Sequence, residues 1–312
     1  MQIIENLDDI PNIQNAVVTS GTFDGVHVGH KKILKHLVKT AEKIGGQSVV
    51  LTFWPHPRFV LFPNDNSLKL ISTFEEKAII LEEAGIDFLV KIEFTKAFSQ
   101  LSSESFIQNV IIDKLKTKKL IIGYDHHFGK NREGSFDYLK ANAERFGFEV
   151  EEIKRQDIDE VGVSSTKIRL ALEEGEVDHA SHLIGHSYTM HGGVVEGQKI
   201  GKSIGFPTAN IGLKENYKLI PKDGVYFVRV FVLNQWWNGM LNIGARPTIE
   251  NASRAIEVHI IDFNEDIYGE SITVDFIKRI RDEKKFESLE ALKIQLEKDK
   301  VLAEALIKKE VS

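Results

Sequence analysis

The sequence predicts an α/β domain followed by an all-β domain, and three observations support this fold class. The chain has 312 residues, a length typical of two ordinary domains. In its first half, short β-branched runs alternate with amphipathic segments, which indicates a parallel sheet covered by helices on both faces. After residue 185 short strands dominate instead. We therefore expect an α/β domain over residues 1–184 and a small barrel or sandwich with a terminal helix over residues 185–312.

The elements of the first half follow from hydrophobic periodicity and from helix end signals. Apolar residues at helical spacing predict a helix that begins at His30 and ends at Gly45. Thr73 and Glu76 have the spacing of a capping box, so a second helix is expected from there to Gly85. Strands are expected at 16–23, 48–53, 88–94, 119–125 and 148–154, and further helices near 103–116 and 135–147.

The second half consists of short strands separated by turn residues. Asn234 and Gln235 form one such turn, and residues 264–266 form another. The strands are expected at 189–196, 224–233, 236–244, 255–263 and 271–277, and the terminal helix at 287–309.

Composition excludes several classes of protein. The chain has no cysteine, which excludes disulfides, thiolate metal ligands and a cysteine nucleophile. Its net charge of -6 disfavours binding to nucleic acid or to an anionic membrane. No apolar run approaches the roughly 20 residues of a membrane span, and the N-terminal segment lacks the features of a signal peptide. We expect a cytoplasmic protein with no nucleic-acid or membrane partner, and leave its oligomeric state open.

The stretch GTFDGVHVGH (21–30) combines glycines and histidines between an expected strand and an expected helix. Ligands of open α/β sheets bind at such carboxyl ends of strands. Free N–H groups at a helix N-terminus attract anions, and Gly29 lets the backbone approach a ligand closely. His27 and His30 could then donate hydrogen bonds to phosphate oxygens. On spacing alone, a pair of solvated loop histidines explains the stretch equally well.

The segment SSTKIRLALEEG (164–175) places three hydroxyl residues just before a helix. Lys167 and Arg169 then fall in its first turn, where positive charge opposes the helix dipole. A bound anion would offset that cost, and the hydroxyls could bind it as well. The alternative is an ordinary Ser/Thr N-cap.

The segment GQKIGKSIGFPTANI (197–211) is another stretch in which glycines and polar residues lie close together. It is not a Walker A loop, because three residues rather than four separate Gly197 from Gly201. Gly205 and Pro207 also follow where that motif requires a helix.

Thr208 and Asn210 lie two residues apart in this segment. On an extended chain their side chains point to the same side. Mg²⁺ in a phosphoryl-transfer site takes few protein ligands and completes its shell with water and substrate phosphates, so these neutral oxygens suit it. A turn stabilised by asparagine and proline is the alternative.

The first-half motifs together resemble a known family. GTFDGVHVGH carries the HxGH motif of the nucleotidylyltransferase superfamily, and SSTKIR resembles the second phosphate-binding signature of that superfamily. TFWPHP (52–57) and GYDHHFGKNREG (123–134) resemble segments of the adenylyltransferase module of bacterial bifunctional riboflavin kinase/FAD synthetases. The match covers most of residues 15–185 and implies a Rossmann-like nucleotidylyltransferase domain.

This resemblance implies that FMN and ATP react to give FAD and pyrophosphate. His27 and His30 are expected to act as catalytic residues that hold the ATP phosphates. His56 and Asp125 are expected on the flavin side. The implied ATP-binding residues are Thr22, Phe23, Gly25, Gly29, Ser164, Ser165, Thr166 and Arg169.

Four segments of the second half resemble the riboflavin kinase module, across nearly all of residues 185–300. They are YTMHGGVVEGQKIGKSIGFPTANI, GVYFVRV, NIGARPT and EVHIIDFNEDIYGE. The resemblance implies a small β-barrel that phosphorylates riboflavin to FMN with ATP and Mg²⁺. Thr208 and Asn210 would be metal ligands, and Glu257 would be catalytic. The implied ATP-binding residues are Gly193, Gly201, Lys202, Thr208 and Asn210.

The chemistry of Glu257 is also intelligible without the family. A carboxylate can accept the proton of a primary alcohol while that alcohol attacks a γ-phosphorus. The alternative is a solvated surface glutamate.

One feature departs from the family pattern, and one segment has no assigned residues. Lys202-Ser203 stands where many members have Arg-Thr, and lysine cannot make the bidentate phosphate contact. Residues 281–299 resemble the flavin-covering region.

Three other functions are alternatives to the bifunctional enzyme that the resemblance implies. One module could have kept its activity while the other serves as a scaffold, although both motif sets look intact. A small barrel can also bind oligonucleotides, as a regulator would, but the acidic charge disfavours that reading. A tRNA synthetase could share HxGH, yet this chain is short and shows no recognisable anticodon-binding extension.

Overall fold

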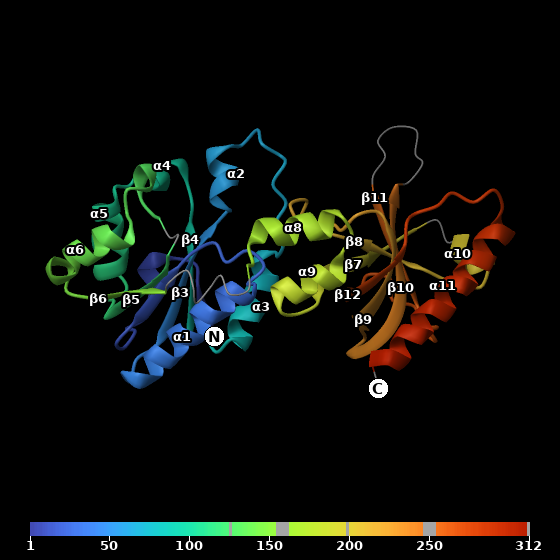
Figure 1. The fold of residues 1–312 in the computed structure, drawn as a ribbon, viewed down its shortest axis with the longest axis horizontal. Helices are drawn as coiled ribbons and strands as arrows, with labels where there is room; N and C mark the ends of the chain where they lie inside the picture. The colour runs from blue at the N-terminus through green and yellow to red at the C-terminus, as the bar shows by residue number, and fades with distance from the viewer. Residues whose placement is uncertain (125–126, 154–161, 198–199, 246–253, 311–312) are drawn as a thin grey trace. The chain divides into compact units, whose positions relative to one another are not determined.

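The computed structural model describes residues 1–124, 127–153, 162–197, 200–245 and 254–310 (Figure 1). Within it the chain forms two compact units, Met1–Ser165 and Thr166–Ser312, which are described separately below.

The first unit is built on a six-stranded parallel sheet with the strand order β1-β4-β3-β2-β5-β6. The chain runs from β2 outward to β3 and β4, and then returns to the other side of β2 for β5 and β6. This reversal creates a switch point between β2 and β5, where ligands of open sheets bind. The parallel sheet predicted from the sequence is confirmed. Its strands are β1 (Gln2–Ile4), β2 (Val17–Ser20), β3 (Ser48–Trp54), β4 (Phe88–Glu93), β5 (Lys119–Gly123) and β6 (Glu149–Ile153).

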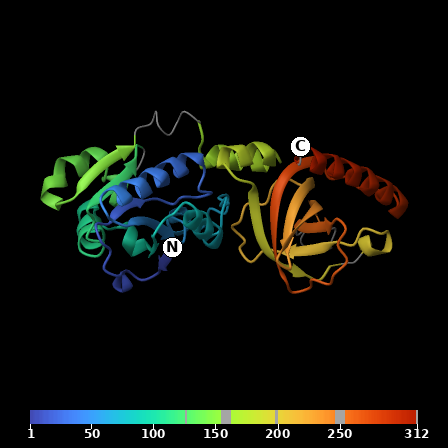
Figure 2. The same ribbon diagram turned by 90° about the horizontal axis from the view of Figure 1, so that it is seen from below.

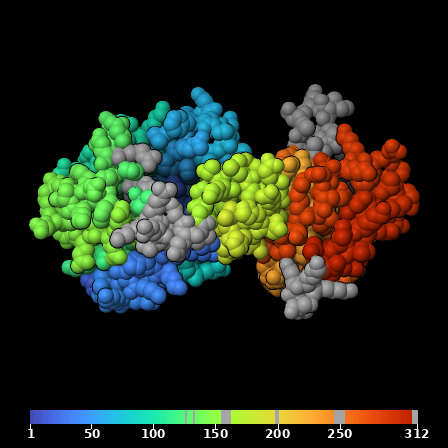
Figure 3. Space-filling model, viewed as in Figure 1, coloured from blue at the N-terminus to red at the C-terminus, as the bar shows by residue number. Residues whose placement is uncertain are grey.

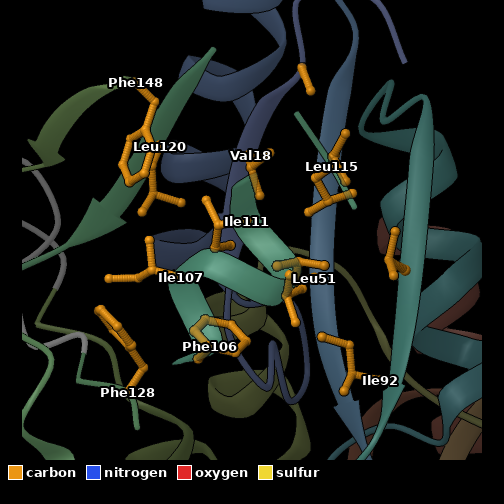
Figure 4. Close-up of a cluster of buried hydrophobic side chains, with 14 of the residues drawn as sticks. Val18, Leu51, Ile92, Phe106, Ile107, Ile111, Leu115, Leu120, Phe128 and Phe148 are labelled. Atoms are coloured by element: carbon orange, nitrogen blue, oxygen red, sulfur yellow. The ribbon is translucent and has the colours of Figure 1, made fainter. Parts of the chain in front are cut away.

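Helices cover both faces of this sheet. α1 (Val28–Lys43) and α3 (Phe74–Glu83) pack Leu34, Leu37 and Leu81 against one face. α5 (Ser103–Phe106), the π-helical turn η2 (Ile107–Ile112) and α6 (Phe136–Phe146) pack on the other. Figure 4 shows this second cluster, in which Val18 and Leu51 of the sheet meet Phe106 and Ile111. Because both faces of the sheet are covered, the central strand β2 and the first five residues of β3 are buried without alternation.

Local signals explain most helix ends in this unit. The predicted capping box is present, since Thr73 Oγ1 accepts from the Glu76 N–H and Glu76 accepts from the Thr73 N–H. Gly147 ends α6 in the left-handed conformation. The helix expected near 103–116 is instead divided between α5 and η2. The short elements are η1 (Leu7–Asp9), α2 (Pro57–Leu61), α4 (Lys96–Ser99) and η3 (Lys130–Arg132).

The second unit is a closed six-stranded barrel with the order β10-β11-β8-β7-β12-β9, which confirms the predicted barrel. Its strands are β7 (Tyr188–Val195), β8 (Ala209–Gly212), β9 (Gly224–Val232), β10 (Gln235–Ala245), β11 (Arg254–Ile260) and β12 (Ser271–Arg281). Its helices are α8 (Ser165–Glu173), α9 (Val177–Ile184), α10 (Ile200–Ser203) and α11 (Leu289–Glu310).

The terminal helix α11 runs across the outer face of the barrel (Figures 1 and 2). Its Ala303 belongs to a small cluster with Phe227 of β9 and Met240 of β10. On another part of the barrel, α9 packs against β7 and β12, and Ser181 Oγ accepts from the Tyr188 N–H at 3.0 Å. Helices α8 and α9 lie on the molecular surface (yellow-green in Figure 3).

Candidate functional sites

The first candidate site is the loop that follows β2 at the carboxyl edge of the sheet. Three of its residues have a left-handed backbone: Phe23 (φ 47°), Gly25 (φ 78°) and Val26 (φ 37°). Such conformations are unusual for phenylalanine and valine, and they cluster at functional loops. A Cβ at Gly25 would lie 2.8 Å from Cγ2 of Ile71, so only glycine fits there.

Asp24 fixes this loop. Its side chain is 3% exposed, and its Oδ1 accepts the backbone N–H groups of Ile71 at 3.0 Å and of Ser72 at 3.2 Å. The N–H of Gly25 in turn donates to Ser72 Oγ at 3.0 Å. A buried carboxylate needs such donors, and here they tie the loop to the segment before α3. No motif in the sequence points to Asp24.

His27 caps the first helix, which corrects one expectation. The sequence predicted that the helix begins at His30, whereas α1 begins at Val28, because Nδ1 of His27 accepts the backbone N–H of His30 at 3.4 Å. With Nδ1 acting as an acceptor, the proton of the neutral ring lies on Nε2. The two histidines do lie together, as predicted from their spacing: their rings stack at 3.7 Å between centroids.

His30 is held in an apolar setting. Its ring lies 5.1 Å from that of Phe23, and its buried Nδ1 has no hydrogen-bond partner among the described residues. Burial, together with the neighbouring His27 and Lys77, lowers the pKa of His30 well below its usual value. His30 is therefore neutral at physiological pH.

Lys77 lies beside this histidine pair, although sequence analysis gave it no role. It projects from the first turn of α3, is 3% exposed, and donates to Thr52 Oγ1 at 3.3 Å. Thr52 Oγ1 itself donates to the carbonyl oxygen of Thr22 at 3.5 Å. Burial lowers the pKa of Lys77 to about 8, while the charge of Asp24 opposes the shift. A buried cation thus lies beneath the loop.

The second predicted phosphate motif begins at the same loop. Ser165 opens α8, and its Oγ donates to the carbonyl oxygen of Asp24 at 3.2 Å. Ser164 is exposed. Thr166 and Arg169 follow in the first turns of α8, within the second unit.

The remaining predicted residues of this site have separate positions. Thr22 and Gly29 lie on either side of the left-handed loop residues, with Gly29 buried in α1. His56 caps α2, where its Nδ1 accepts the Arg58 N–H at 3.2 Å. Asp125 lies outside the described residues.

An aromatic cavity of about 310 Å³ opens at the same edge of the sheet. Phe53, the next-to-last residue of β3, lines it and lies 5.9 Å from Phe98. Phe106 lies 5.6 Å from Phe128 on the same lining. Such a cavity suits a flat apolar ring system.

The second candidate site lies on the outer face of the barrel and is set by strand register. Asn210 of β8 is paired with Glu257 of β11, and Glu257 is paired with Asn242 of β10. Directly paired residues point to the same face of a sheet, so these three polar side chains form a row across three strands. Ile256 and Val258 are buried in the barrel, so Glu257 points outward.

Two cavities of the barrel share Thr208, and the smaller one is lined by Asn242 and Glu257 of this row. One of about 290 Å³ is lined by Thr208, Asn242, Glu257, Arg281, Phe286 and Leu296. The other, of about 510 Å³, includes Lys202, Thr208 and Tyr268 in its lining. Thr208 lines both, so it stands where a group could pass from one cavity to the other. Glu257 is half-buried and lines a cavity, which argues against the alternative that it is an ordinary solvent-exposed glutamate.

The predicted metal ligands fit a small hard cation. Asn210 is 5% exposed, and a Cβ at Gly197 would lie 1.9 Å from its Nδ2, so glycine is needed for this approach. Thr208 and Asn210 offer the neutral oxygens that Mg²⁺ accepts beside substrate phosphates. The described residues contain no cluster of three or more His, Asp or Glu suited to a metal. Gly201 also lines the smaller cavity. Gly193 lies on β7 and is followed by Val194, which lines the larger cavity.

A buried ion pair fixes one wall of the smaller cavity. Asp299 of α11 is 0% exposed, and its Oδ2 accepts from Arg281 Nε at 2.9 Å. Gln295 Nε2 donates to Asp299 Oδ1 at 2.8 Å. Arg281 also donates from Nη1 to the Asp282 carbonyl at 2.9 Å. The terminal helix therefore orients a guanidinium at the cavity that Glu257 lines. The family resemblance of residues 281–299 assigned no role to Arg281 or Asp299 individually.

Comparison with known proteins assigns each half to a family. The family model described as FAD synthetase matches residues 9–167, and the model described as riboflavin kinase matches residues 184–307. The chain is 38% identical over 307 residues to a bifunctional riboflavin kinase/FMN adenylyltransferase of Haemophilus influenzae, covering 98% of this chain and 99% of that protein. The protein of the same name from Listeria monocytogenes is 40% identical over 286 residues, covering 91% and 90%.

A solved structure from Streptococcus pneumoniae has the same fold. It is described as a macrolide-efflux protein, has a TM-score of 0.88 at 33% identity, and the match covers 97% of this chain and 98% of that one. Among the residues that the structure describes here, no helix has both the length and the apolar character to cross a bilayer.

Proposed function

The chain belongs to the bifunctional riboflavin kinase/FMN adenylyltransferase family, and on that premise we propose how its two units carry out the two reactions. The protein converts riboflavin to FMN and FMN to FAD. The observation that supports our division of labour is that each unit has its own polar site and its own family match. The phosphoryl and adenylyl donor in both reactions is ATP.

FAD forms at the histidine loop of the first unit. A phosphate oxygen of FMN attacks the α-phosphorus of ATP in line, the bond to the β-phosphate oxygen breaks, and pyrophosphate leaves. No covalent enzyme intermediate is needed, so positioning and charge stabilisation provide the catalysis. His27 and His30 donate hydrogen bonds to the phosphates as charge develops on the leaving group. Ser164, Ser165, Thr166 and Arg169 complete the phosphate contacts.

The aromatic cavity receives the flavin ring of FMN in this reaction. Its phenylalanines lie at the carboxyl edge of the sheet, as does the histidine loop. A flavin seated there would direct its ribityl phosphate along that edge. His56 and Asp125 are proposed on the flavin side, and Thr22, Phe23, Gly25 and Gly29 shape the nucleotide pocket.

Riboflavin is phosphorylated at the polar row of the barrel. The flavin occupies the smaller cavity and ATP the larger one, and the γ-phosphoryl group passes between them at Thr208. The ribityl 5′-hydroxyl oxygen attacks the γ-phosphorus, Glu257 accepts the hydroxyl proton, and ADP leaves. Gly193, Gly201 and Lys202 contribute to binding ATP. Thr208 and Asn210 would hold Mg²⁺, which neutralises phosphate charge when bound.

Chelation of the metal tests the phosphoryl-transfer assignment. With riboflavin and ATP, we expect FMN to appear first and FAD second, as followed by chromatographic separation of the flavins. Excess EDTA should stop both steps, and added Mg²⁺ should restore them. FMN that accumulates without FAD at every ATP concentration would contradict the bifunctional assignment.

Two fragments test the separability of the units and the predicted boundary at residue 184. Residues 166–312 should phosphorylate riboflavin and form no FAD, because the polar row and both barrel cavities lie within them. Residues 185–312 lack α9 and its contact with β7, so this fragment should unfold at a lower temperature. If neither fragment phosphorylates riboflavin while the full chain does, the units do not act independently.

A further inference from the structure

Binding of ATP and release of pyrophosphate at the histidine loop require positive charge, and neither histidine provides it. His27 accepts a hydrogen bond at Nδ1 as the cap of α1, which leaves its ring uncharged. His30 stacks on that ring and on Phe23, with a buried Nδ1. A neutral imidazole keeps one N–H donor, and two stacked and largely buried imidazoles disfavour a charged form. Within the described part of the first unit, the cation must come from another residue.

Lys77 has the position for this role. Its side chain is buried beneath the loop, it donates to Thr52 Oγ1, and its charge is felt by His30. The ring of Trp54 lies 5.5 Å from Nζ. No described carboxylate forms an ion pair with Nζ. The charge of Asp24 favours the protonated form of Lys77, but the oxygens of Asp24 accept hydrogen bonds from the backbone of residues 71 and 72. Buried lysines without an ion pair are rare in proteins, because desolvation of the charge is costly.

We propose that Lys77 is an electrostatic positioning residue for FAD formation, which supplies the fixed positive charge beneath the two neutral histidines that bind the phosphates. This inference rests on the proposed assignment of FAD formation to the histidine loop. Lys77 acts through His27 and His30, which contact the phosphates, while Lys77 stabilises the negative charge that accumulates on the departing pyrophosphate. The histidines thereby provide hydrogen bonds, and the lysine provides the charge.

The proposal predicts that an apolar replacement of Lys77 leaves the stability of the folded protein unchanged or raises it, whereas FAD formation becomes slower. Without a ligand, the buried ammonium lacks a full counter-charge, so an apolar side chain of similar length is tolerated at this position. With pyrophosphate bound, the same ammonium becomes favourable. A lysine that serves only to hold α3 in place would behave in the opposite way, because its removal would weaken the folded protein and leave the response to pyrophosphate unchanged.

The test compares Lys77→Met with a matched control, Lys91→Met, in the full-length protein. Lys91 belongs to the same unit but pairs with Glu5 at 2.8 Å. Pyrophosphate should raise the thermal midpoint of the wild type, because a bound ligand stabilises the folded state. For Lys77→Met we expect an unchanged or higher midpoint without ligand, loss of this rise, and FAD formation from FMN slowed about 10²–10³-fold. Riboflavin phosphorylation should stay normal in both variants, and Lys91→Met should keep FAD formation and its pyrophosphate response.

A Lys77→Met protein that unfolds at a lower temperature, or fails to fold, would overturn the proposal, because the lysine would then be structural. Normal FAD formation or a preserved pyrophosphate response in Lys77→Met would also overturn it. His30→Ala separates this failure from that of the underlying assignment. If His30→Ala abolishes FAD formation and Lys77→Met does not, only the role of Lys77 is wrong. If both variants form FAD normally, the site itself is misassigned.

Discussion

Replacing Glu257 by glutamine will slow riboflavin phosphorylation by about 10²–10⁴-fold, the usual contribution of a general base. Glutamine keeps the size of the side chain but cannot accept the proton of the ribityl hydroxyl. The Asn210 and Asn242 side chains on either side of it are uncharged, so no neighbour in the row can replace the carboxylate. The measurement is the initial rate of FMN formation from riboflavin and ATP.

The same Glu257→Gln protein should still convert supplied FMN to FAD, because that reaction takes place at the histidine loop of the first unit, and Glu257 belongs to the second. Glu270→Gln is a suitable control, since Glu270 is exposed and precedes β12 outside both barrel cavities. Full kinase activity in Glu257→Gln, with native circular dichroism, would show that Glu257 is an ordinary surface residue.

Replacing His30 by alanine should have the second large effect, on FAD formation. Loss of one donor to developing phosphate charge costs roughly 2.7–4 kcal/mol of transition-state stabilisation, or about 10²–10³-fold in rate. The stacked partner His27 would also lose its neighbour. The measurement is the rate of FAD and pyrophosphate formation from FMN and ATP.

His36→Ala provides the matched control for His30→Ala. His36 lies farther along the same helix α1, where it pairs with Glu151 at 2.7 Å, away from the loop. This variant should keep FAD formation, and both variants should phosphorylate riboflavin normally. Equal FAD formation by His30→Ala and His36→Ala would mean that the paired histidines are merely structural.

Local patterns in the sequence were sufficient for most of the fold. The periodicity of Leu34 and Leu37 predicted the buried face of α1, and the spacing of Thr73 and Glu76 predicted the capping box of α3. These features depend on neighbours within one turn of helix, so the sequence displays them directly. The edge strand β1 was missed because it has three residues and only one is buried. Strands this short have too few residues for a periodic signal.

The missed functional residues depend on contacts between distant segments. Lys77 follows two glutamates, and a lysine in such a run normally faces solvent, so nothing local indicates that it is buried. Asn242 acquires meaning only through the register that pairs it with Glu257. Asp299 lies on a helix whose sequence gives no sign that it reaches Arg281 across the barrel surface. Family resemblance indicated the motifs, and the fold shows which further side chains surround them.

The central claim is that two sites on separate units act in sequence, and one time course tests it most directly. Glu257→Gln, His30→Ala and an equimolar mixture of the two are each incubated with riboflavin, ATP and Mg²⁺, and the flavins are separated by chromatography. Over the time in which the wild type completes both steps, we expect Glu257→Gln to leave most riboflavin unreacted, His30→Ala to accumulate FMN, and the mixture to proceed to FAD. Formation of FAD from riboflavin at the wild-type rate by either variant alone would contradict the account.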